Sequence, residues 1–138
     1  MKLRDFDFRI WDEDNEEFYK NPSIFKIKQI KGPHNVVLSS YSDNERINFE
    51  GYDRKFEVEL FTRLYDKNGK KVYENDIVKA KNPFNYLEAK ISIHKEGTFY
   101  LENKSGHYMG SLIYLVEDEG YTIEIIGNIH ENPELLKC

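Results

Sequence analysis

The residues best suited to hold a metal ion form an acidic run near the start of the sequence, from Asp12 to Glu17. Carboxylate oxygens gathered in this way are the ligands that Ca²⁺ takes in calcium-binding loops. Such a loop also needs a glycine at its sixth position and a glutamate at its twelfth, where this sequence has Glu17 and Ser23. The run Asp66-Lys67-Asn68-Gly69 lacks the pattern as well. We interpret both runs as charged hairpin turns and predict no metal site.

The residues that could act as nucleophiles or bases form no recognisable motif. The four histidines, His34, His94, His107 and His130, are scattered singly, and Cys138 stands at the very end. There is no Gly-x-Ser-x-Gly elbow and no glycine-rich phosphate loop before a helix. Among 25 acidic residues no carboxylate pair stands out as an acid–base site. We therefore predict no catalytic residue, no cofactor and no enzymatic activity. His94 alternates outward on its predicted strand, which indicates a solvated surface residue.

The charge of the chain disfavours nucleic acid as a partner. The net charge is −5 and the pI is about 5.4, whereas nucleic-acid binding draws much of its affinity from Lys and Arg. The stretch from Phe25 to Lys31 carries alternating lysines, which is typical of the wet face of a strand. A base-stacking groove would combine tyrosines with Lys26, Lys28, Lys79, Lys81 and Lys90. A nucleic-acid-binding small β-barrel is therefore the alternative function.

Composition indicates a folded domain with a thin core rich in aromatic rings. Hydrophobic residues make up 39% and charged residues 33%, a balance that leans toward disorder. Aromatic residues nevertheless reach 14%, and disordered chains are poor in such rings. The single cysteine excludes an internal disulfide, and the opening residues contain no continuous apolar run. We expect a cytoplasmic protein with no signal peptide and no membrane-spanning segment.

Apolar side chains recur at every second position, which is typical of β-strands. The alternation from Phe6 to Trp11, followed by polar residues and Phe18, predicts a first hairpin. In the middle of the chain, Asn68-Gly69 lies between two alternating runs. This pair predicts a second hairpin, because both residues tolerate positive φ.

Later segments continue the β pattern almost to the end of the chain. Alternation from Leu87 to Ile93 predicts a strand, and we expect the apolar run from Leu112 to Val116 to be a strand too. Only the tail is expected to be helical, since Asn132 suits an N-cap and Pro133 the first helical position. Short strands punctuated by turns in this way are typical of a sandwich or a barrel.

Three segments are specific enough, when taken together, to support a family resemblance. They are Phe6 to Asp12, with an aromatic-Arg-x-Trp-Asp element, Val58 to Lys79, around an Asp-Lys-Asn-Gly hairpin, and Ile123 to Leu136. In this order they resemble the YopX family of short phage and prophage proteins. The resemblance implies no activity, and a shared fold would not settle function.

The resemblance also implies an all-β fold. The expected parts are a small N-terminal β portion (residues 1–50), an open SH3-like C-terminal β-barrel (residues 51–138) and a short C-terminal helix. The polar stretch from Tyr41 to Asp53 is the best candidate boundary, and we predict that its first part, up to Arg46, is a loop.

Two positions depart from the family's pattern. The family often has glycine where this chain has Arg63, just before the central turn, and again where it has Asn75. Both positions are therefore expected to need a positive φ, which Asn accepts easily and Arg poorly.

For function, we expect a phage-type accessory protein, in the host cytoplasm if phage-encoded, that binds a protein partner or a second copy of itself. An open sheet leaves unpaired edges that must be covered, and self-association is one way to cover them. Rings that face away from a core suit interfaces, so the predicted contact residues are Trp11, Phe61, Tyr65 and Tyr73. The alternative is that these rings cover the second face of a folded sheet.

Overall fold

The structure, a computed structural model, describes residues 1–19, 24–29, 36–42, 45–50 and 56–137. For 24–29, 36–42 and 45–50 the description is of the backbone. Several predictions lie outside the described residues or side chains: the lysine stripe at Lys26, Lys28 and Lys31, the break at Gly32-Pro33, the turn at Gly51 to Asp53, and the residues His34 and Cys138.

The chain forms two compact units. The first unit contains Met1–Phe8 and Glu59–Cys138, and the second contains Arg9–Val58. Nearly all regular structure in both units is β-strand, so the predicted all-β class is confirmed. The division into residues 1–50 and 51–138 stays a prediction, as does the SH3-like character of the C-terminal part.

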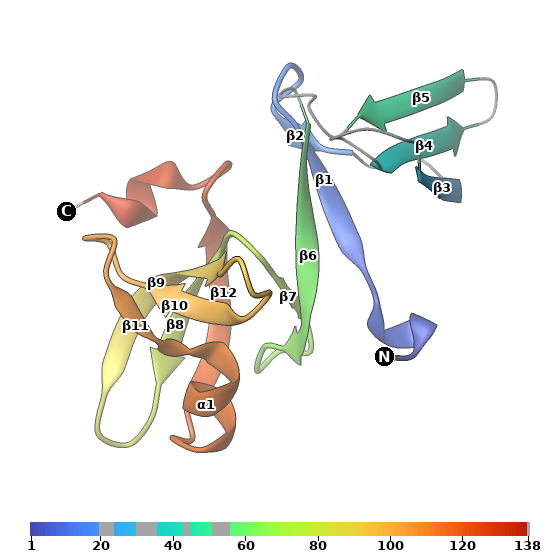
Figure 1. The fold of residues 1–138 in the computed structure, drawn as a ribbon. Helices are drawn as coiled ribbons and strands as arrows, with labels where there is room; N and C mark the ends of the chain where they lie inside the picture. Colours follow the sequence, from blue (N-terminus) through green and yellow to red (C-terminus); the bar gives the residue numbers. More distant parts are fainter. Residues whose placement is uncertain (20–23, 30–35, 43–44, 51–55, 138) are drawn as a thin grey trace. The chain divides into compact units, whose positions relative to one another are not determined.

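A five-stranded sheet dominates the first unit, with the strand order β11-β10-β9-β8-β12. Its strands are β8 (Asp76–Lys81), β9 (Tyr86–Ile93), β10 (Phe99–Glu102), β11 (Tyr108–Ser111) and β12 (Thr122–Asn128). All neighbouring strands pair antiparallel. The sheet is curved, as Figure 1 shows, and its two edge strands are β11 and β12. One face is apolar and forms the core, which includes Val78, Ala80, Ala89, Ile91, Leu101 and Ile123.

The predicted central hairpin is confirmed as β6 (Phe56–Tyr65) and β7 (Lys71–Tyr73). Phe61 pairs with Tyr73 and Tyr65 pairs with Lys71. Between these pairs, β6 has three residues (62–64) and β7 has only Val72, so β6 forms a bulge. The Thr62 hydroxyl donates to the Val72 carbonyl at 2.7 Å inside this bulge. Such a bulge needs a residue outside the β conformation, and Arg63 supplies it with φ of +71°.

Both predicted positive-φ positions are confirmed. Arg63 has φ of +71° and Asn75, in the turn between β7 and β8, has φ of +69°. Left-handed backbone costs a side chain with a Cβ roughly 1 kcal/mol, and Asn tolerates it better than Arg. Arg63 is therefore a point of local backbone strain.

The prediction of a strand from Leu112 to Val116 is wrong, and so is the expectation that only the tail is helical. These residues form helix α1 (Leu112–Glu117), which packs on β10 and β11. Leu112 and Leu115 are both buried at helical spacing, which a short apolar run leaves ambiguous in the sequence. Gly110 allows the close approach, since a Cβ there would lie 3.1 Å from the Leu115 side chain.

The chain ends in a 3₁₀-helix, η2 (Pro133–Leu136), so the predicted short C-terminal helix is confirmed in a tighter form. Asn132 stands at the N-cap position without a side-chain cap bond to the helix. Its carboxamide oxygen instead accepts the backbone N–H of Asn128 at 3.2 Å. A second 3₁₀-helix, η1 (Leu3–Asp5), lies at the other end of the chain.

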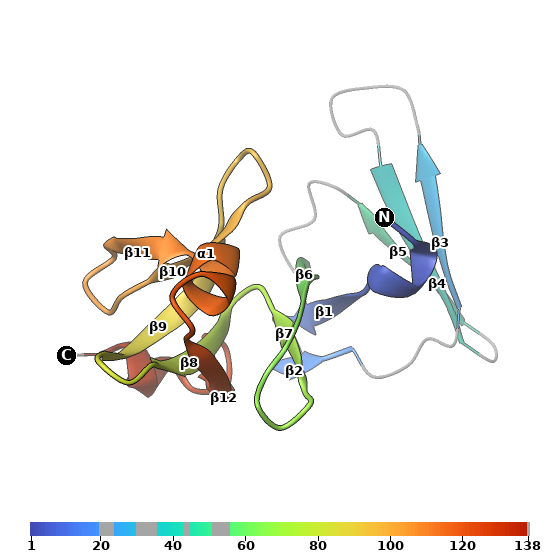
Figure 2. The same ribbon diagram turned by 90° about the horizontal axis from the view of Figure 1, so that it is seen from below.

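The second unit contains a small hairpin and a three-stranded meander. β1 (Phe8–Asp12) begins at the unit boundary and pairs with β2 (Glu17–Phe18), which confirms the predicted first hairpin. The meander runs in the order β3-β4-β5, as Figure 2 shows. Its strands are β3 (Ile24–Gln29), β4 (Val36–Ser42) and β5 (Glu45–Glu50). The prediction of a loop from Tyr41 to Arg46 is wrong, because Tyr41 pairs with Arg46 across the β4–β5 hairpin.

Candidate functional site

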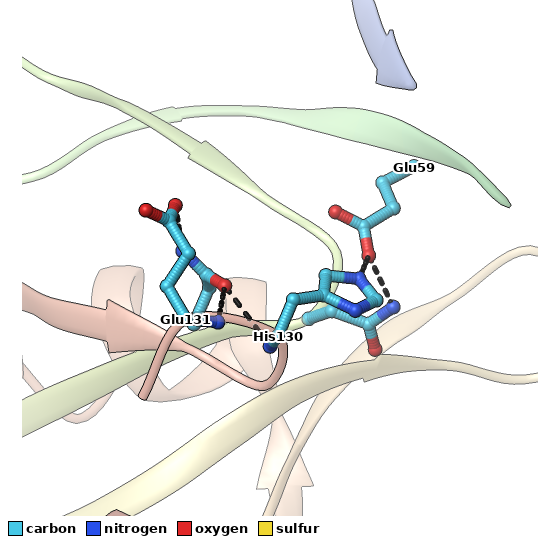
Figure 3. A network of polar contacts seen from close by, with 5 residues as sticks. Glu59, His130 and Glu131 are labelled. Carbon is cyan, nitrogen blue, oxygen red and sulfur yellow. Dashed lines mark hydrogen bonds and ion pairs between the residues drawn. The ribbon is translucent and has the colours of Figure 1, made fainter. Parts of the chain in front are cut away.

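A buried carboxylate, Glu59 on β6, is the centre of the most enclosed polar network in the described part of the first unit. The Glu59 side chain is 0% exposed. Its Oε2 accepts a hydrogen bond from Asn75 Nδ2 at 2.6 Å and lies 2.8 Å from His130 Nε2, as Figure 3 shows. A carboxylate is costly to bury unless it is paired and hydrogen-bonded. These contacts supply that pairing.

The backbone around His130 fixes the direction of the imidazole. The Asn128 carboxamide oxygen accepts the backbone N–H groups of His130 and Glu131 at 3.0 and 2.9 Å. Asn128 Nδ2 donates to Glu131 Oε1 at 2.9 Å, so one side chain organises the whole turn. Asn75 is held by backbone bonds instead: its N–H donates to the Ile91 carbonyl, and its carbonyl accepts the N–H of Ile129. The pair Glu59–His130 is thus built on rigid backbone.

An imidazole oriented by a carboxylate is half of a general acid–base site. The other half would be a nucleophile and an oxyanion-binding group arranged around a space for the reacting atom. The contacts described for Glu59 are to Asn75 and His130, which tie β6 to the turn before β8 and to the segment after β12. By joining these three segments the network stabilises the fold of the first unit. Spacing could not predict it, since 71 positions separate Glu59 from His130.

The acidic runs that resemble metal sites serve as turns. Asp12 Oδ1 accepts the backbone N–H groups of Asp14 and Asn15, and its Oδ2 accepts from the Asn15 carboxamide. Asp66 Oδ1 likewise accepts the N–H groups of Asn68 and Lys70, each at 2.9 Å. Carboxylates used in this way close hairpin turns, as the sequence predicts.

Asp66 also reaches out of its own turn. Its second oxygen, Oδ2, accepts the backbone N–H of Ile125 on β12 at 3.2 Å. Burial acts to raise the pKa of Asp66, but the hydrogen bonds from Lys70, Ile125 and Asn68 outweigh it and hold that pKa below 3.8. The carboxylate therefore stays ionised while it joins the β6–β7 turn to the edge of the large sheet.

The predicted contact residues differ in exposure. Trp11 and Phe61 are 6% and 7% exposed, Tyr73 is half-buried and Tyr65 is 58% exposed. Phe61 lies between Tyr65 and Tyr73, at centroid distances of 5.5 and 5.8 Å. Trp11 belongs to the second unit, where it packs edge-on against Phe18. Buried rings are accounted for by packing, and a role of any of the four at an interface stays a prediction.

Asp7, near the start of the chain, is bound by two side chains of β7. Asp7 Oδ2 accepts hydrogen bonds from the Tyr73 hydroxyl and from Lys71 Nζ, and Asp7 Oδ1 accepts from the Phe8 N–H. Burial raises the pKa of Asp7, but the bonds from Tyr73 and Lys71 outweigh it and the pKa lies below 3.8. Lys71 Nζ also lies 5.1 Å above the Phe61 ring, a cation–π contact.

Two of the lysines proposed for a nucleic-acid groove, Lys79 and Lys90, face carboxylates, whereas Lys81 is exposed and lies opposite Thr122 and Tyr86 in the sheet. Lys90 Nζ lies 3.2 Å from Glu102 Oε2. In the sheet register Lys79 stands opposite Glu88 on one side and Glu124 on the other. Charges paired in this way release few counterions from phosphates, so no described contact favours nucleic acid. His94 is exposed, as predicted, and its ring stacks on Tyr100 at 4.1 Å.

Exposed large side chains with apolar groups lie along strand β11 and helix α1. We name them together the β11–α1 surface; its residues are Tyr108, Met109, Ile113 and Tyr114. All four large side chains are exposed, and Tyr108 reaches 58%. Among the described residues, no backbone hydrogen bond outside the ladder with β10 is found for Tyr108–Gly110. Sequence reasoning missed this surface because it assigned Leu112 to Val116 to a strand.

Comparisons with known proteins agree with this description. The family described as YopX protein matches residues 7–137. The fold is similar to the crystal structure of protein yopX from Bacillus subtilis, with a TM-score of 0.64 and 20% identity over 94% of this chain and 97% of that chain. It is also similar to protein EF1440 from Enterococcus faecalis, with a TM-score of 0.55 and 22% identity over 94% and 96%. The search of curated proteins gives no match. Among the described residues, no helix has the length and apolar character needed to cross a bilayer.

Proposed function

The chain belongs to the YopX family, and from this premise and its open sheet edge we propose that it is a non-enzymatic module that binds protein, with a second copy of itself as the partner. The observation that carries the proposal is the β11 edge. Its outer side has no backbone partner among the described residues, and exposed apolar side chains lie beside it. Open edges of this kind are sites of strand pairing unless a protein blocks them.

The chemistry of β11 favours a second copy as the occupant. The strand reads Tyr-Met-Gly-Ser and carries no charged side chain. Natural edges are often protected by lysine or proline, and β11 has neither. Antiparallel pairing of β11 with its own copy brings no like charges together and gives a two-fold, self-complementary interface. A net charge of −5 elsewhere on each chain keeps further copies apart.

The remaining parts of the proposal follow from the same residues. A non-enzymatic role is supported by Glu59 and His130, whose described contacts are structural. A reducing compartment such as the cytoplasm, of a host cell if the protein is phage-encoded, suits a chain with one cysteine. We propose an accessory role there rather than a catalytic one.

Light scattering coupled to size-exclusion chromatography tests the proposal. We expect the wild-type chain to associate as its concentration rises. The double variant Tyr108→Lys/Met109→Lys should remain a monomer, because two ammonium groups placed on the edge repel their own copy. Phe84→Lys is the matched control, since Phe84 is 89% exposed but lies outside the β11–α1 surface. A wild-type chain that is monomeric at every concentration would contradict the proposal, and so would a double variant that associates like the wild type.

A further inference from the structure

A shallow cavity lies where the start of β9 meets the turn between β10 and β11. Its volume is about 440 Å³, and it is open to solvent over most of its extent. The lining residues are Tyr86, Leu87 and Glu88 from β9, and Asn103, Lys104 and Ser105 from the turn. The register explains this neighbourhood, because Lys90 pairs with Glu102 and the two segments continue side by side from there.

The turn that forms one wall is fixed by its own hydrogen bonds. The Asn103 carboxamide oxygen accepts the N–H groups of Ser105 and His107 at 3.0 and 2.9 Å. The backbone N–H of Asn103 donates to the His107 carbonyl at 2.9 Å, which closes the loop. A wall that is already ordered loses little conformational entropy when a ligand binds.

The charged groups of the cavity balance each other. Glu88 Oε2 lies 3.6 Å from Lys104 Nζ, and Glu88 Oε1 accepts a hydrogen bond from the Tyr86 hydroxyl at 2.7 Å. The hydrogen bond from Tyr86, with the charges of Lys104 and Lys79, holds the pKa of Glu88 below 4.5. The Glu88 carboxylate and the Lys104 ammonium cancel each other's charge, so the pair offers little net attraction to a small ion of either sign.

The same groups suit a neutral ligand with many hydroxyls. Each Glu88 oxygen has a second lone pair that accepts from a ligand O–H, and Lys104 has further N–H groups to donate. Ser105 adds a hydroxyl that both donates and accepts. The exposed ring of Tyr86 supplies a flat apolar platform for the C–H face of a sugar ring.

We propose that this cavity is a binding site for a neutral saccharide. Tyr86 stacks on the sugar ring, Glu88 accepts hydrogen bonds from its hydroxyl groups, and Lys104 and Ser105 bind neighbouring oxygens. The site is separate from the β11–α1 surface in its residues, so binding here does not depend on self-association.

Titration of ¹⁵N-labelled protein with cellobiose and with N,N′-diacetylchitobiose tests the proposal by amide chemical shifts. We expect saturable shifts confined to residues 86–88 and 103–105, with a dissociation constant of about 1 mM for one of the two sugars. Tyr86→Ala should weaken binding at least tenfold, and Glu88→Gln should weaken it as well. The control Phe84→Ala removes a neighbouring exposed ring that does not line the cavity and should bind like the wild type.

Three results would overturn the proposal. Shifts that stay linear with both sugars show that no saccharide site exists. Saturable shifts that survive Tyr86→Ala place the site elsewhere. Saturation of the same residues by inorganic phosphate, with no response to either sugar, shows that the cavity selects anions. The spectrum of each unliganded variant must match that of the wild type outside the substituted segment, which separates lost binding from lost folding.

Discussion

The two edges of the five-stranded sheet are treated in opposite ways. The β12 edge is covered by the β6–β7 turn, where Lys67 donates its N–H to the Ile123 carbonyl at 2.8 Å and Asp66 accepts from Ile125. Lys67 also forms an ion pair with Glu124. The β11 edge carries no such cover among the described residues. One edge is therefore closed by the chain itself, whereas the other has no such cover in the described part of the chain.

The two edges of the same sheet therefore differ in whether the chain covers them. At β12 the Asp66 carboxylate has two roles, because it accepts hydrogen bonds within its own turn and also accepts one from the strand. On β11 the chain places apolar side chains and no charge. Variants can therefore separate two properties: changes at the covered edge should alter stability, and changes at the open edge should alter association.

The largest loss of stability is expected at the Glu59–His130 pair, which lies at neither edge of the sheet. It is the reference against which the losses at the two edges are compared. His130→Ala leaves the fully buried Glu59 without its imidazole partner. We expect the free energy of unfolding to fall by about 3 kcal/mol, because a buried carboxylate loses a hydrogen-bonded neighbour. Urea unfolding followed by circular dichroism measures the change. His107→Ala, at an exposed histidine for which only backbone hydrogen bonds are described, is the control and should change it by less than about 0.5 kcal/mol. Equal effects of the two variants would contradict a structural role for the network.

At the covered edge, Asp66→Ala removes the acceptor of three backbone N–H groups, those of Asn68, Lys70 and Ile125. We expect a loss of about 2 kcal/mol in the free energy of unfolding. Asp66→Asn keeps one acceptor oxygen and should lose less. Association measured by light scattering should be unchanged in both. A loss of association without a loss of stability would reverse the assignment of the two edges.

The pH dependence of the covered edge follows from the lowered pKa of Asp66. A carboxyl group whose folded pKa lies below its unfolded value of 3.8 contributes stability that is complete above that value. This contribution is lost as the pH falls from 3.8 through the folded pKa. The difference in unfolding free energy between wild type and Asp66→Asn should therefore shrink in that window. A difference that stays constant from neutral to acid pH would show that the charge of Asp66 contributes nothing.

The smallest effect is expected at Arg63, in the bulge before the covering turn. Arg63→Gly should raise the free energy of unfolding by about 1 kcal/mol, because glycine adopts positive φ without a steric cost. The variant loses an ion pair with Asp5 at 3.5 Å, but both side chains are exposed enough for that pair to contribute little. Arg63→Ala keeps the Cβ and should bring no gain. A higher melting temperature for the alanine variant than for the glycine variant would refute the strain at this position.

Local chemistry made much of the first unit predictable. Asn68-Gly69 predicted the central hairpin, and Gly69 alone of the two adopts positive φ, at +79°. The run that begins at Asp66 was interpreted as a hairpin turn, and the Asp66 side chain bonds that turn. The positive φ at Arg63 and Asn75 was expected from the resemblance, which implies that glycine is frequent at both positions.

The features that sequence reasoning missed depend on tertiary contacts. Leu112 to Val116 fits a strand or a buried helix equally well by its apolar character, and packing of Leu115 over Gly110 decides for the helix. The pairing of Glu59 with His130 joins segments far apart in the chain, and no spacing rule reaches that far. Tyr41 to Arg46 is polar like a loop, yet cross-strand pairing makes it the end of a hairpin.

Amide hydrogen exchange, measured at low and high protein concentration, tests the contrast between the two edges most directly. The account predicts that the Ile125 amide on β12 is protected at both concentrations, because Asp66 accepts its hydrogen bond within the chain. Those amides of β11 (Tyr108–Ser111) that point away from β10 should gain protection only at high concentration, when a second copy pairs with the strand. Protection of β11 that is the same at both concentrations would contradict an edge left open for a partner.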